Sequence, residues 1–526
     1  MGIPSFYRHL VKTNPKLISQ QNGGKPSVLA LDLNCAIYHC LSKLQKKTPY
    51  VAKNRITFED ALIQSVVLYI VKLRDHVQPS DLLYVAVDGV VPMAKIRQQR
   101  MRRFKSVWVS AEESKIKGEE SVGWDRNSIT PGTEFMDRLC EKLSDWASKQ
   151  KNTIVSGVRE SGEGEQKIMA FLRSNPPKGE VIVYGLDADL IVLCLWHFEV
   201  YGWSFKLLRE DVEMKGGVKL NAFGEETLLY FDIDMLASII ISKWNVGIHD
   251  YVGAMSFLGN DFIPHGLTLC IREEGIDRLM EILEMSEDSL VFRDNDGVWK
   301  YNIKTLQYII GKIVMVEDRW LLSGLAKKLK MSAHGYSKPG AEPQSDVEKA
   351  LTIMNSLPLT WKVERCIAER NDSGWYLKDN WEATYYSEFL WGAEPADVNR
   401  EWLKGIQWVL NYYTGSKPVD FLWYYPWYLP PLFKDIHMSE DAFNNNNEKV
   451  EPNPIQPISQ LIMVLPIESY ALLPNHLRRL PFLKPEYYPK TWTFFSTGRR
   501  QLWECEPMIP MLPYHIVARF IKNFTR

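Results

Sequence analysis

The sequence predicts an α/β fold: a mostly parallel, twisted sheet flanked by helices, followed by a mainly helical, aromatic-rich second region packed against it. Three short runs are almost continuously apolar, which is typical of buried parallel strands: Val28–Leu33, Leu82–Asp88 and Val181–Asp187. An amphipathic helix is expected at Phe58–Val77, with two acids in its first turn. Strand–helix–strand repetition favours a parallel sheet with right-handed crossovers.

We expect the chain to divide into two parts. Its 526 residues are enough for several domains. Residues 1–327 contain the predicted strands and would form the first part. Residues 328–346 are polar and contain Gly and Pro, so we predict a linker there. Residues 347–526 form the second part, whose many Trp and Tyr side chains are mostly expected in its core; within it, residues 444–457 are predicted to be a surface loop.

Composition excludes several classes of protein. Hydrophobic residues make up 45% and charged residues 24% of the chain, as in ordinary globular proteins rather than disordered or coiled-coil chains. Lys and Arg total 63 against 64 Asp and Glu, a formal net charge of −1. A broadly cationic coat for nucleic acid is therefore excluded, because it would need bulk positive charge. Local patches of charge stay possible.

The chain carries no signal for secretion or membrane insertion. Its seven cysteines include no C-x-x-C pair, which favours reduced, buried thiols over a disulfide framework or a zinc ribbon. No apolar run reaches the ~18 residues of a membrane span, and the N-terminus lacks the pattern of a signal peptide. We expect an intracellular, monomeric protein without a membrane partner, and favour the cytoplasm over the nucleus.

Each of the three predicted strands is followed closely by an acid. Asp32, Asp88 and Asp187 stand at the strand ends, and Asp189 comes two residues after the last of them. Ligands of parallel α/β sheets bind beyond the carboxyl ends of the strands. These four carboxylates are therefore expected to meet in one crevice.

Three further acids are candidates for the same crevice. Asp261 follows the turn residues Gly259 and Asn260, and Glu163 and Glu165 open a predicted helix. Clustered carboxylates need cations to stay ionised, and oxygen ligands without His or Cys favour Mg²⁺ or Mn²⁺. Two such ions about 4 Å apart suit attack on a phosphodiester. Alternatively, any one of these acids is a helix cap or a solvated loop residue.

The segment after the second predicted strand is strongly basic. Residues 89–110 contain no acid and six basic side chains: Lys95, Arg97, Arg100, Arg102, Arg103 and Lys105. A helix that begins near Pro92 would place a cluster suited to a terminal phosphate on one face: Lys95, Gln99, Arg102 and Arg103. The alternative is a solvated charged helix, which the lack of compensating acids disfavours.

These motifs together resemble the XRN family of 5′→3′ exoribonucleases along essentially the whole chain. In the first part the resembling segments are MGIPSFYRHL, LALDLNCAIYHC, VAVDGVVPMAKIRQQRMRRFKS, SITPGTEFM, SGEGEQKIM, VIVYGLDADLIVL, FKLLREDV and FLGNDFIPH. In the second they are WLKGIQWVLNYYTG, FLWYYPWYLPPL, PISQLIMVLP and RRQLWECEPMIPML. The chain looks like a compact member limited to the catalytic core.

The resemblance implies a PIN/flap-nuclease-like sheet and a specific activity: processive hydrolysis of single-stranded RNA with a 5′-monophosphate, releasing nucleoside 5′-monophosphates. It implies two divalent ions, Mg²⁺ or Mn²⁺, bound by seven acids: Asp32, Asp88, Glu163, Glu165, Asp187, Asp189 and Asp261. It assigns the 5′-phosphate to Lys95, Gln99, Arg102 and Arg103. It also implies a second region that encloses the active site, so that only single strands enter.

The resemblance further implies that the terminal base stacks between a His and a Trp. We place the Trp at Trp423, whereas the His position, six residues after Asp32, holds Tyr38 in this chain. A Tyr can still stack on a base at about 1–3 kcal/mol.

Two other functions are considered. A flap-type DNA nuclease would share the acid-tipped sheet, but the segment after Asp261 lacks the Gly-rich helix–hairpin–helix expected of that class. An inactive RNA-binding scaffold is disfavoured because all seven acids are present.

Overall fold

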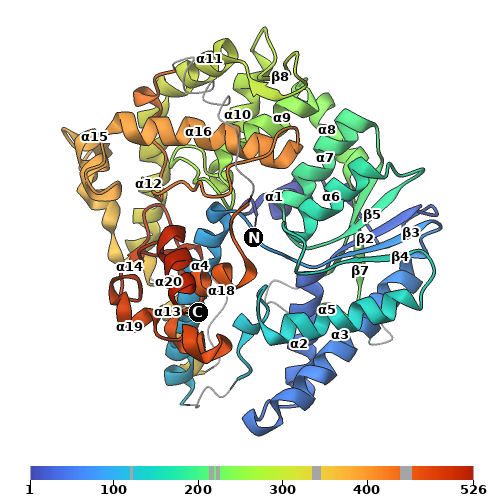
Figure 1. The fold of residues 1–526 in the computed structure, drawn as a ribbon. Coiled ribbons are helices and arrows are strands. Elements are labelled where there is room, and N and C mark those ends of the chain that lie inside the picture. The colour runs from blue at the N-terminus through green and yellow to red at the C-terminus, as the bar shows by residue number, and fades with distance from the viewer. Residues whose placement is uncertain are drawn as a thin grey trace.

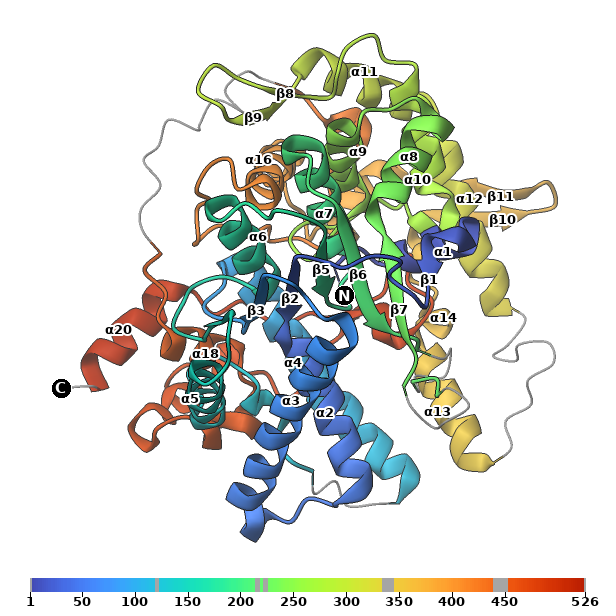
Figure 2. The ribbon, with the colours of Figure 1, turned by 90° about the vertical axis from the view of Figure 1, so that its right-hand side faces the viewer.

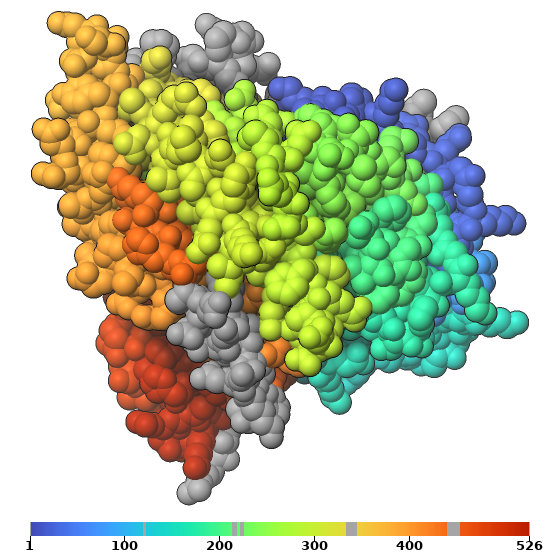
Figure 3. Space-filling model, turned by 90° about the horizontal axis from the view of Figure 1, so that it is seen from above, coloured from blue at the N-terminus to red at the C-terminus, as the bar shows by residue number. Residues whose placement is uncertain are grey.

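The computed structural model describes residues 2–118, 123–212, 218–220, 226–333, 345–438 and 453–524. A seven-stranded sheet lies on one side of the molecule, and the aromatic-rich second region, coloured orange to red, lies on the other (Figure 1). The same separation is visible from above (Figure 3). The predicted fold class is confirmed.

The main sheet has the strand order β1-β7-β6-β5-β2-β3-β4. Strands β4, β3, β2, β5 and β6 are parallel, while β7 and β1 are antiparallel to their neighbours. The three strands predicted from sequence are β3, β2 and β5, which are adjacent in the sheet. In chain order the strands are β1 Ile18–Ser19, β2 Val28–Asp32, β3 Leu82–Ala86, β4 Thr153–Ser156, β5 Val181–Tyr184, β6 Phe205–Glu210 and β7 Leu228–Asp232.

Helices cover both faces of this sheet (Figure 2). Alternate strand residues point to opposite faces, so Leu29 and Leu31 pack into a core with the first set of helices, and Val28 and Ala30 into a core with the second. The first set is α2 Leu33–Lys47, α3 Arg55–Val77 and α5 Glu134–Ser148. The second set is α6 Gly164–Ser174, α7 Asp189–Tyr201 and α8 Ile233–Trp244.

Helix α3 differs from its prediction at the amino end. It begins at Arg55, three residues before the predicted start. Glu59 consequently lies inside the helix and is fully buried, where it accepts hydrogen bonds from Trp124 and Arg138 at 3.1 and 2.7 Å. Glu59 therefore joins α3 to Arg138 of α5 and to Trp124, which precedes α5. It does not lie in the first turn, where its charge would interact favourably with the helix dipole.

The basic helix α4, Met93–Lys117, begins directly after Pro92, as predicted. One of its side chains anchors the second region: Arg100 is 1% exposed and donates hydrogen bonds to the carbonyl oxygens of Met463, Tyr487 and Pro510. A buried guanidinium needs such partners, because leaving its donors unsatisfied costs free energy. Helix α4 is therefore shared by both parts of the molecule.

The rest of the first part is mainly helical. Its elements are α1 Phe6–Thr13, α9 Ile248–Ala254, η4 Met255–Leu258, η5 Ile271–Glu273, α10 Gly275–Glu284, the hairpin of β8 Val291–Arg293 and β9 Trp299–Tyr301, α11 Ile303–Val314 and α12 Glu317–Ala333. Helix α12 corrects the predicted linker, because residues 328–333 are helical. Lys328 explains why: it is 1% exposed and pairs with Glu364, so this turn is held in the core. Residues 334–344 of that prediction lie outside the described residues.

The second part is mainly helical, as predicted. Its elements are α13 Asp346–Ser356, α14 Pro358–Trp361, the hairpins β10 Ala368–Asn371 with β11 Gly374–Leu377 and β12 Phe494–Phe495 with β13 Glu506–Pro507, α15 Trp381–Thr384, the π-helical turn η7 Tyr385–Phe389, α16 Pro395–Thr414, α18 Pro457–Val464, α19 Leu480–Leu483 and α20 Tyr514–Phe524. One continuous apolar core runs from α7 and α8 into α16 and α18.

Most of the predicted surface loop, residues 444–452, lies outside the described residues. Within the described ranges, no helix is long and apolar enough to cross a bilayer.

Candidate active site

A cavity of about 130 Å³ lies beyond the carboxyl ends of β2, β3 and β5, against α4. Five of the seven predicted acids line it: Asp32, Asp88, Glu163, Glu165 and Asp187. All four residues of the predicted phosphate cluster line it as well: Lys95, Gln99, Arg102 and Arg103. Its remaining lining residues are Asn34, Cys35, Tyr38, Ile129, Pro131 and Gly164. We call this cavity the catalytic pocket.

Close approach of α6 to β2 and β3 brings the first acids together. The backbone N–H of Gly164 donates to Asp88 Oδ1 at 2.7 Å, and Asn34 Nδ2 donates to Asp88 Oδ2 at 2.6 Å. A Cβ on Gly164 would lie 2.4 Å from Asp32 Oδ1, so only glycine allows this approach. The main chain of α6 thereby holds one carboxylate and leaves room for the next.

Lys95 lies between two of the predicted acids. Its Nζ forms ion pairs with Glu163 and with Asp261, the latter at 2.7 Å. Glu163 also accepts a hydrogen bond of 2.7 Å from the hydroxyl of Tyr412 on α16, which belongs to the second part. Asp261 follows the predicted turn. Gly259 in this turn has a φ of 77°, and a Cβ there would lie 2.5 Å from the backbone nitrogen of His265.

Asp189 and Glu165 are buried with unused oxygen atoms. Asp189 is fully buried, and neither of its carboxylate oxygens has a hydrogen-bond partner; the same is true of Glu165 Oε2. Gly2 packs against Asp189, since a Cβ on Gly2 would lie 2.6 Å from Oδ1. Buried polar atoms normally have partners. Both acids are therefore suited to receive a ligand that a carboxylate can bind.

Burial and mutual repulsion raise the pKa of most of these acids. Burial, followed by the charges of Asp88 and Asp187, raises the pKa of Asp32 well above its usual range. Burial and Asp187 raise the pKa of Asp189 to about 7. Burial, followed by the charges of Asp189 and Glu163, raises the pKa of Glu165 well above normal. Asp187 differs: burial opposes its charge, but nearby positive charges hold its pKa at about 2.

This donor set fits divalent cations. The carboxylates repel one another and offer only hard oxygen ligands, which suits Mg²⁺ or Mn²⁺ rather than Zn²⁺. Across the described residues, no three His, Cys, Asp or Glu side chains already stand in the arrangement of a metal site. The fit therefore rests on the unused oxygens of Asp189 and Glu165 and on the raised pKa values.

The catalytic pocket is also lined by cationic and amide side chains of α4. Arg103 is buried, and burial lowers its pKa to about 10. Its Nη1 donates to Asn127 Oδ1 at 3.0 Å, while its Nε is buried without a partner. Gln99 is buried, and its Oε1 lies 3.4 Å from the amide of Gln460. With Arg102 beside them, these groups offer hydrogen-bond donors to an anion.

The two predicted base-stacking residues lie in different surroundings. Tyr38, on α2, lines the catalytic pocket and is 39% exposed, which leaves its ring accessible. Trp423 is 5% exposed, packs on Trp408 and donates its indole N–H to Glu401 at 3.1 Å. It does not line the catalytic pocket. The structure therefore brings Tyr38, but not Trp423, to that cavity.

Three supporting residues escaped the sequence analysis. Asn34 and Tyr412 hold Asp88 and Glu163, and Lys167 donates to the carbonyl oxygens of Val87 and Gly157 at 2.8 Å, beneath the strand ends. Asn34 stands two residues after Asp32, which is a signal that sequence could have used. Tyr412 is one of many aromatic residues expected in the core, and nothing in the sequence separates it from them.

Two family models match the chain. The model for the XRN 5′-3′ exonuclease N-terminus matches residues 1–211. The model for the Xrn1 helical domain matches residues 374–522. Together these ranges make up more than half of the chain and cover both parts of the fold.

Curated relatives agree with these models. The chain is 30% identical over 592 residues to 5′-3′ exoribonuclease 1 of Homo sapiens, which covers 97% of the chain and 33% of that protein. It is 25% identical to 5′-3′ exoribonuclease 2 of Candida albicans, covering 97% of the chain and 71% of that protein. For 5′-3′ exoribonuclease 2 of Arabidopsis thaliana the identity is 26%, over 97% of the chain and 66% of that protein. The chain thus spans a third of the human relative and about two thirds of the others.

Proposed function

Because this chain belongs to the XRN family of 5′→3′ exoribonucleases, we propose that it degrades single-stranded RNA processively from a 5′-monophosphate end. The products would be nucleoside 5′-monophosphates. The proposed cofactor is a pair of Mg²⁺ or Mn²⁺ ions. One observation carries this proposal: carboxylates and the cluster of Lys95, Gln99, Arg102 and Arg103 line the same small cavity, with Lys95 paired to Glu163.

The basic cluster would bind the 5′-terminal phosphate. A monophosphate ester carries more charge than an internal diester, so guanidinium groups at Arg102 and Arg103 favour the end of a strand over its interior. The cavity volume of about 130 Å³ is well below the roughly 300–1,000 Å³ typical of drug-sized ligands. This volume suits a phosphate and leaves little room for a cap or a triphosphate.

The carboxylates would hold the divalent ions. The proposed ligands are Asp32, Asp88, Glu163, Glu165, Asp187, Asp189 and Asp261, of which the first five line the catalytic pocket. Such ions, when bound, lower the pKa of coordinated water and neutralise charge on the scissile phosphate. The protein's own part is to fix the carboxylates: Gly164 and Asn34 hold Asp88, and Tyr412 holds Glu163.

Tyr38 would stack on the terminal base, since its ring is exposed beside the phosphate cluster. A platform of this kind accepts every base, because each base has a π-face, and would let the enzyme act without sequence preference. The shared core between both parts of the chain favours a rigid enclosure around a single strand. Together these features support processive movement along RNA.

The test uses 3′-labelled RNA of one sequence with three different 5′ ends: monophosphate, hydroxyl and cap. With Mg²⁺, the full chain should convert only the monophosphorylated RNA rapidly to mononucleotides. Replacing Arg102 by Gln should reduce this preference, whereas Arg479→Gln, at an exposed site away from the pocket, should not. Equal degradation of all three RNAs would overturn the proposed phosphate cluster.

A flap-type DNA substrate belongs in the same assay. After Asp261 the chain forms η5 and α10, and a β-hairpin of β8 and β9 then separates α10 from α11. This differs from the helix–hairpin–helix motif, in which a short Gly-rich turn joins two helices directly. Faster cleavage of flap DNA than of single-stranded RNA would therefore contradict the proposal. Binding of RNA with no cleavage in either metal would instead support the inactive-scaffold alternative.

A further inference from the structure

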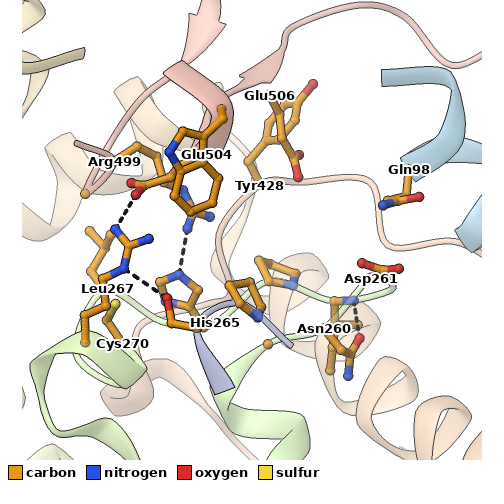
Figure 4. Close-up of a pocket in the computed structure, with 18 of the residues that line it drawn as sticks. Gln98, Asn260, Asp261, His265, Leu267, Cys270, Tyr428, Arg499, Glu504 and Glu506 are labelled. Carbon is orange, nitrogen blue, oxygen red and sulfur yellow. Dashed lines mark hydrogen bonds and ion pairs between the residues drawn. The ribbon is translucent and has the colours of Figure 1, made fainter. Parts of the chain in front are cut away.

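A second cavity meets the catalytic pocket at the Lys95–Asp261 ion pair, since Asp261 lines the second cavity and Lys95 lines the first. Figure 4 shows residues that line the second cavity, among them Asp261, His265 and Arg499. It has a volume of about 280 Å³, roughly twice that of the catalytic pocket. Segments far apart in sequence form it: the N-terminal residues, α4, the loop after Gly259 and residues 498–506. Asp261 lines this cavity and is bonded to Lys95, which lines the other. We call it the rear cavity.

Three cations of the rear cavity form no ion pair within 4 Å among the described residues, although Lys105 is attracted by Glu506: Arg97, Lys105 and Arg499. In contrast, the neighbouring Arg272 and Arg500 are neutralised by Glu504 and Glu273. An anion that enters the rear cavity would therefore meet positive charge that the protein has not neutralised, although Glu506 also contributes to the lining.

The unpaired cations keep hydrogen-bond donors available. Arg499 uses Nη1 to bond His265 Nε2 at 2.8 Å, and its buried Nε has no partner. His265 stays neutral there, because burial and Arg499 lower its pKa to about 3. Lys105 gives two bonds to the carbonyl oxygens of Trp503 and Cys505, and Arg97 gives one to that of Pro426. Each side chain has further N–H groups that a phosphate could accept.

Aromatic rings supply a second kind of contact. Tyr428 and Trp427 line the cavity wall, and Trp503 lines it with 54% of its surface exposed. The Arg97 guanidinium lies 4.9 Å from the Tyr428 ring centre. An exposed Trp beside unpaired cations matches the two parts of a nucleotide: a flat base that stacks and a phosphate that accepts charged hydrogen bonds. The volume lies just below the roughly 300–1,000 Å³ of drug-sized ligand sites, which suits a mononucleotide.

We propose that the rear cavity binds a nucleoside 5′-monophosphate, with its phosphate against Arg97, Lys105 and Arg499 and its base against Trp503. This inference rests on the proposed function, because the proposed hydrolysis releases one nucleoside 5′-monophosphate at every cleavage step. The release would occur in the catalytic pocket, which meets the rear cavity at the Lys95–Asp261 ion pair. RNA would occupy the catalytic pocket while the previous product leaves through the rear cavity. The site also accepts free nucleotide from solution, because the same groups recognise it.

The first experiment measures binding without catalysis. Adenosine 5′-monophosphate is titrated by calorimetry into the full chain in EDTA. Two sites are expected for the unmodified protein. Arg499→Gln should weaken one of them on the order of tenfold, because a hydrogen bond to a charged group is lost. Trp503→Ala should weaken the same site, Arg102→Gln should weaken the other, and Arg479→Gln should change neither.

A single site that disappears in Arg102→Gln and is unaffected by Arg499→Gln and Trp503→Ala would overturn the inference. A second result would also overturn it. A 5′-hydroxyl RNA oligonucleotide, but not the mononucleotide, would quench the part of the tryptophan fluorescence that is missing in Trp503→Ala, and the cavity would then be an RNA channel. Two-site binding in a protein that fails to degrade RNA would separate the two proposals: the rear site would stand and the proposed function would fall.

The second experiment distinguishes product from free nucleotide. RNA with a 5′-³²P label is cleaved in a single turnover, and label retained on the protein is measured after rapid filtration. Retention that falls in Arg499→Gln, while the single-turnover rate is unchanged, is the expected result. Rapid loss of label from the unmodified protein, with two-site binding in calorimetry, would overturn the assignment to product and leave a site for free nucleotide.

Discussion

The candidate active site and the junction between the two parts of the chain bury charge differently. In the first part, Asp189 and Glu165 are buried with unused oxygens, and burial with repulsion raises their pKa values. At that junction Glu364 is fully buried, and its Oε1 is paired with Lys328 of α12 at 2.5 Å and accepts the N–H of Gly498 at 2.7 Å, while its Oε2 has no partner. A carboxylate that pairs with a cation of the protein serves the fold, whereas several carboxylates that repel one another mark a place that a cation completes.

The largest expected effect comes from removing acids of the catalytic pocket. The double substitution Asp187→Ala with Asp189→Ala should lower RNA hydrolysis about 1,000-fold or more, because bound metal contributes several kcal/mol to the transition state and each 1.36 kcal/mol is a factor of ten. RNA binding should persist, since the phosphate cluster is intact. In EDTA the melting temperature should change little, because removing the repelled carboxylate of Asp189 offsets the loss of the favourable contacts of Asp187 with positive charges.

Single-turnover hydrolysis, filter binding and thermal melting measure these three quantities. The matched control replaces two exposed acids, Asp81→Ala with Asp372→Ala, and should leave all three unchanged. Metal-dependent cleavage at the normal rate in the double variant would contradict the assignment of the metal site. A large fall in melting temperature would contradict the comparison between the active site and the junction.

A smaller effect, on stability alone, is expected at the junction between the two parts. Lys328→Met should destabilise the protein by about 3–5 kcal/mol, because it leaves Glu364 buried without its cation. Activity per folded molecule should be retained. Urea unfolding followed by circular dichroism, with a hydrolysis assay on the folded fraction, measures both.

A double variant that removes both charges of the pair tests this explanation more directly. Lys328→Met combined with Glu364→Leu should recover most of the lost stability, since an apolar pair can replace a buried ion pair. The exposed pair Lys349–Asp346 is the control, where Lys349→Met should cost at most about 1 kcal/mol. If the single variant at Lys328 cost no more than this control, the buried pair would have no structural role.

The smallest effect concerns a buried acid at the start of α12. Burial raises the pKa of Glu317 to about 7, although it accepts the N–H groups of Phe433 and Lys434. Its raised pKa means that the folded protein holds this proton more tightly than the unfolded chain. Stability from this group is thus full below pH 4.5 and is lost as pH rises from there to about 7. One pKa unit is about 1.4 kcal/mol, so a rise from 4.5 to about 7 makes the loss at most about 3.5 kcal/mol.

Glu317→Gln should remove this part of the pH dependence. The melting temperature of the unmodified protein should therefore fall relative to that of the variant as pH rises. Both are measured in EDTA between pH 5 and pH 8. Glu287→Gln, at an exposed site, should follow the unmodified protein throughout. Parallel curves for the unmodified protein and Glu317→Gln would show that this carboxyl does not titrate in that range.

Much of the site followed from local sequence signals. Continuous apolar runs located β2, β3 and β5, and the acids after them met because adjacent parallel strands end at one edge. Helical spacing placed Lys95, Gln99, Arg102 and Arg103 on one wall. Contacts between distant segments were not predictable in this way. Periodicity cannot show that Tyr412 reaches Glu163 across 249 positions, or that Lys328 is held in the core by Glu364.

The linker prediction differed because of contacts that the local pattern does not reveal. Residues 328–333 continue α12, where Leu329 packs in the core and Glu364 pairs with the buried Lys328. Trp423 packs among the aromatic side chains of the second part and does not line the catalytic pocket, so its stacking on a base stays a prediction. At residues 328–333 the tertiary environment, rather than the local pattern, determines the outcome.

The continuous apolar core limits how this protein can be divided. Helices α7 and α8 share that core with α16 and α18, and Arg100 fixes α4 to three carbonyl oxygens of the second part. A fragment containing only the sheet would expose a large apolar surface and lose the wall behind Glu163. Recombination between relatives would thus have to exchange both parts together, and a minimal nuclease could not be obtained by truncation at residue 333.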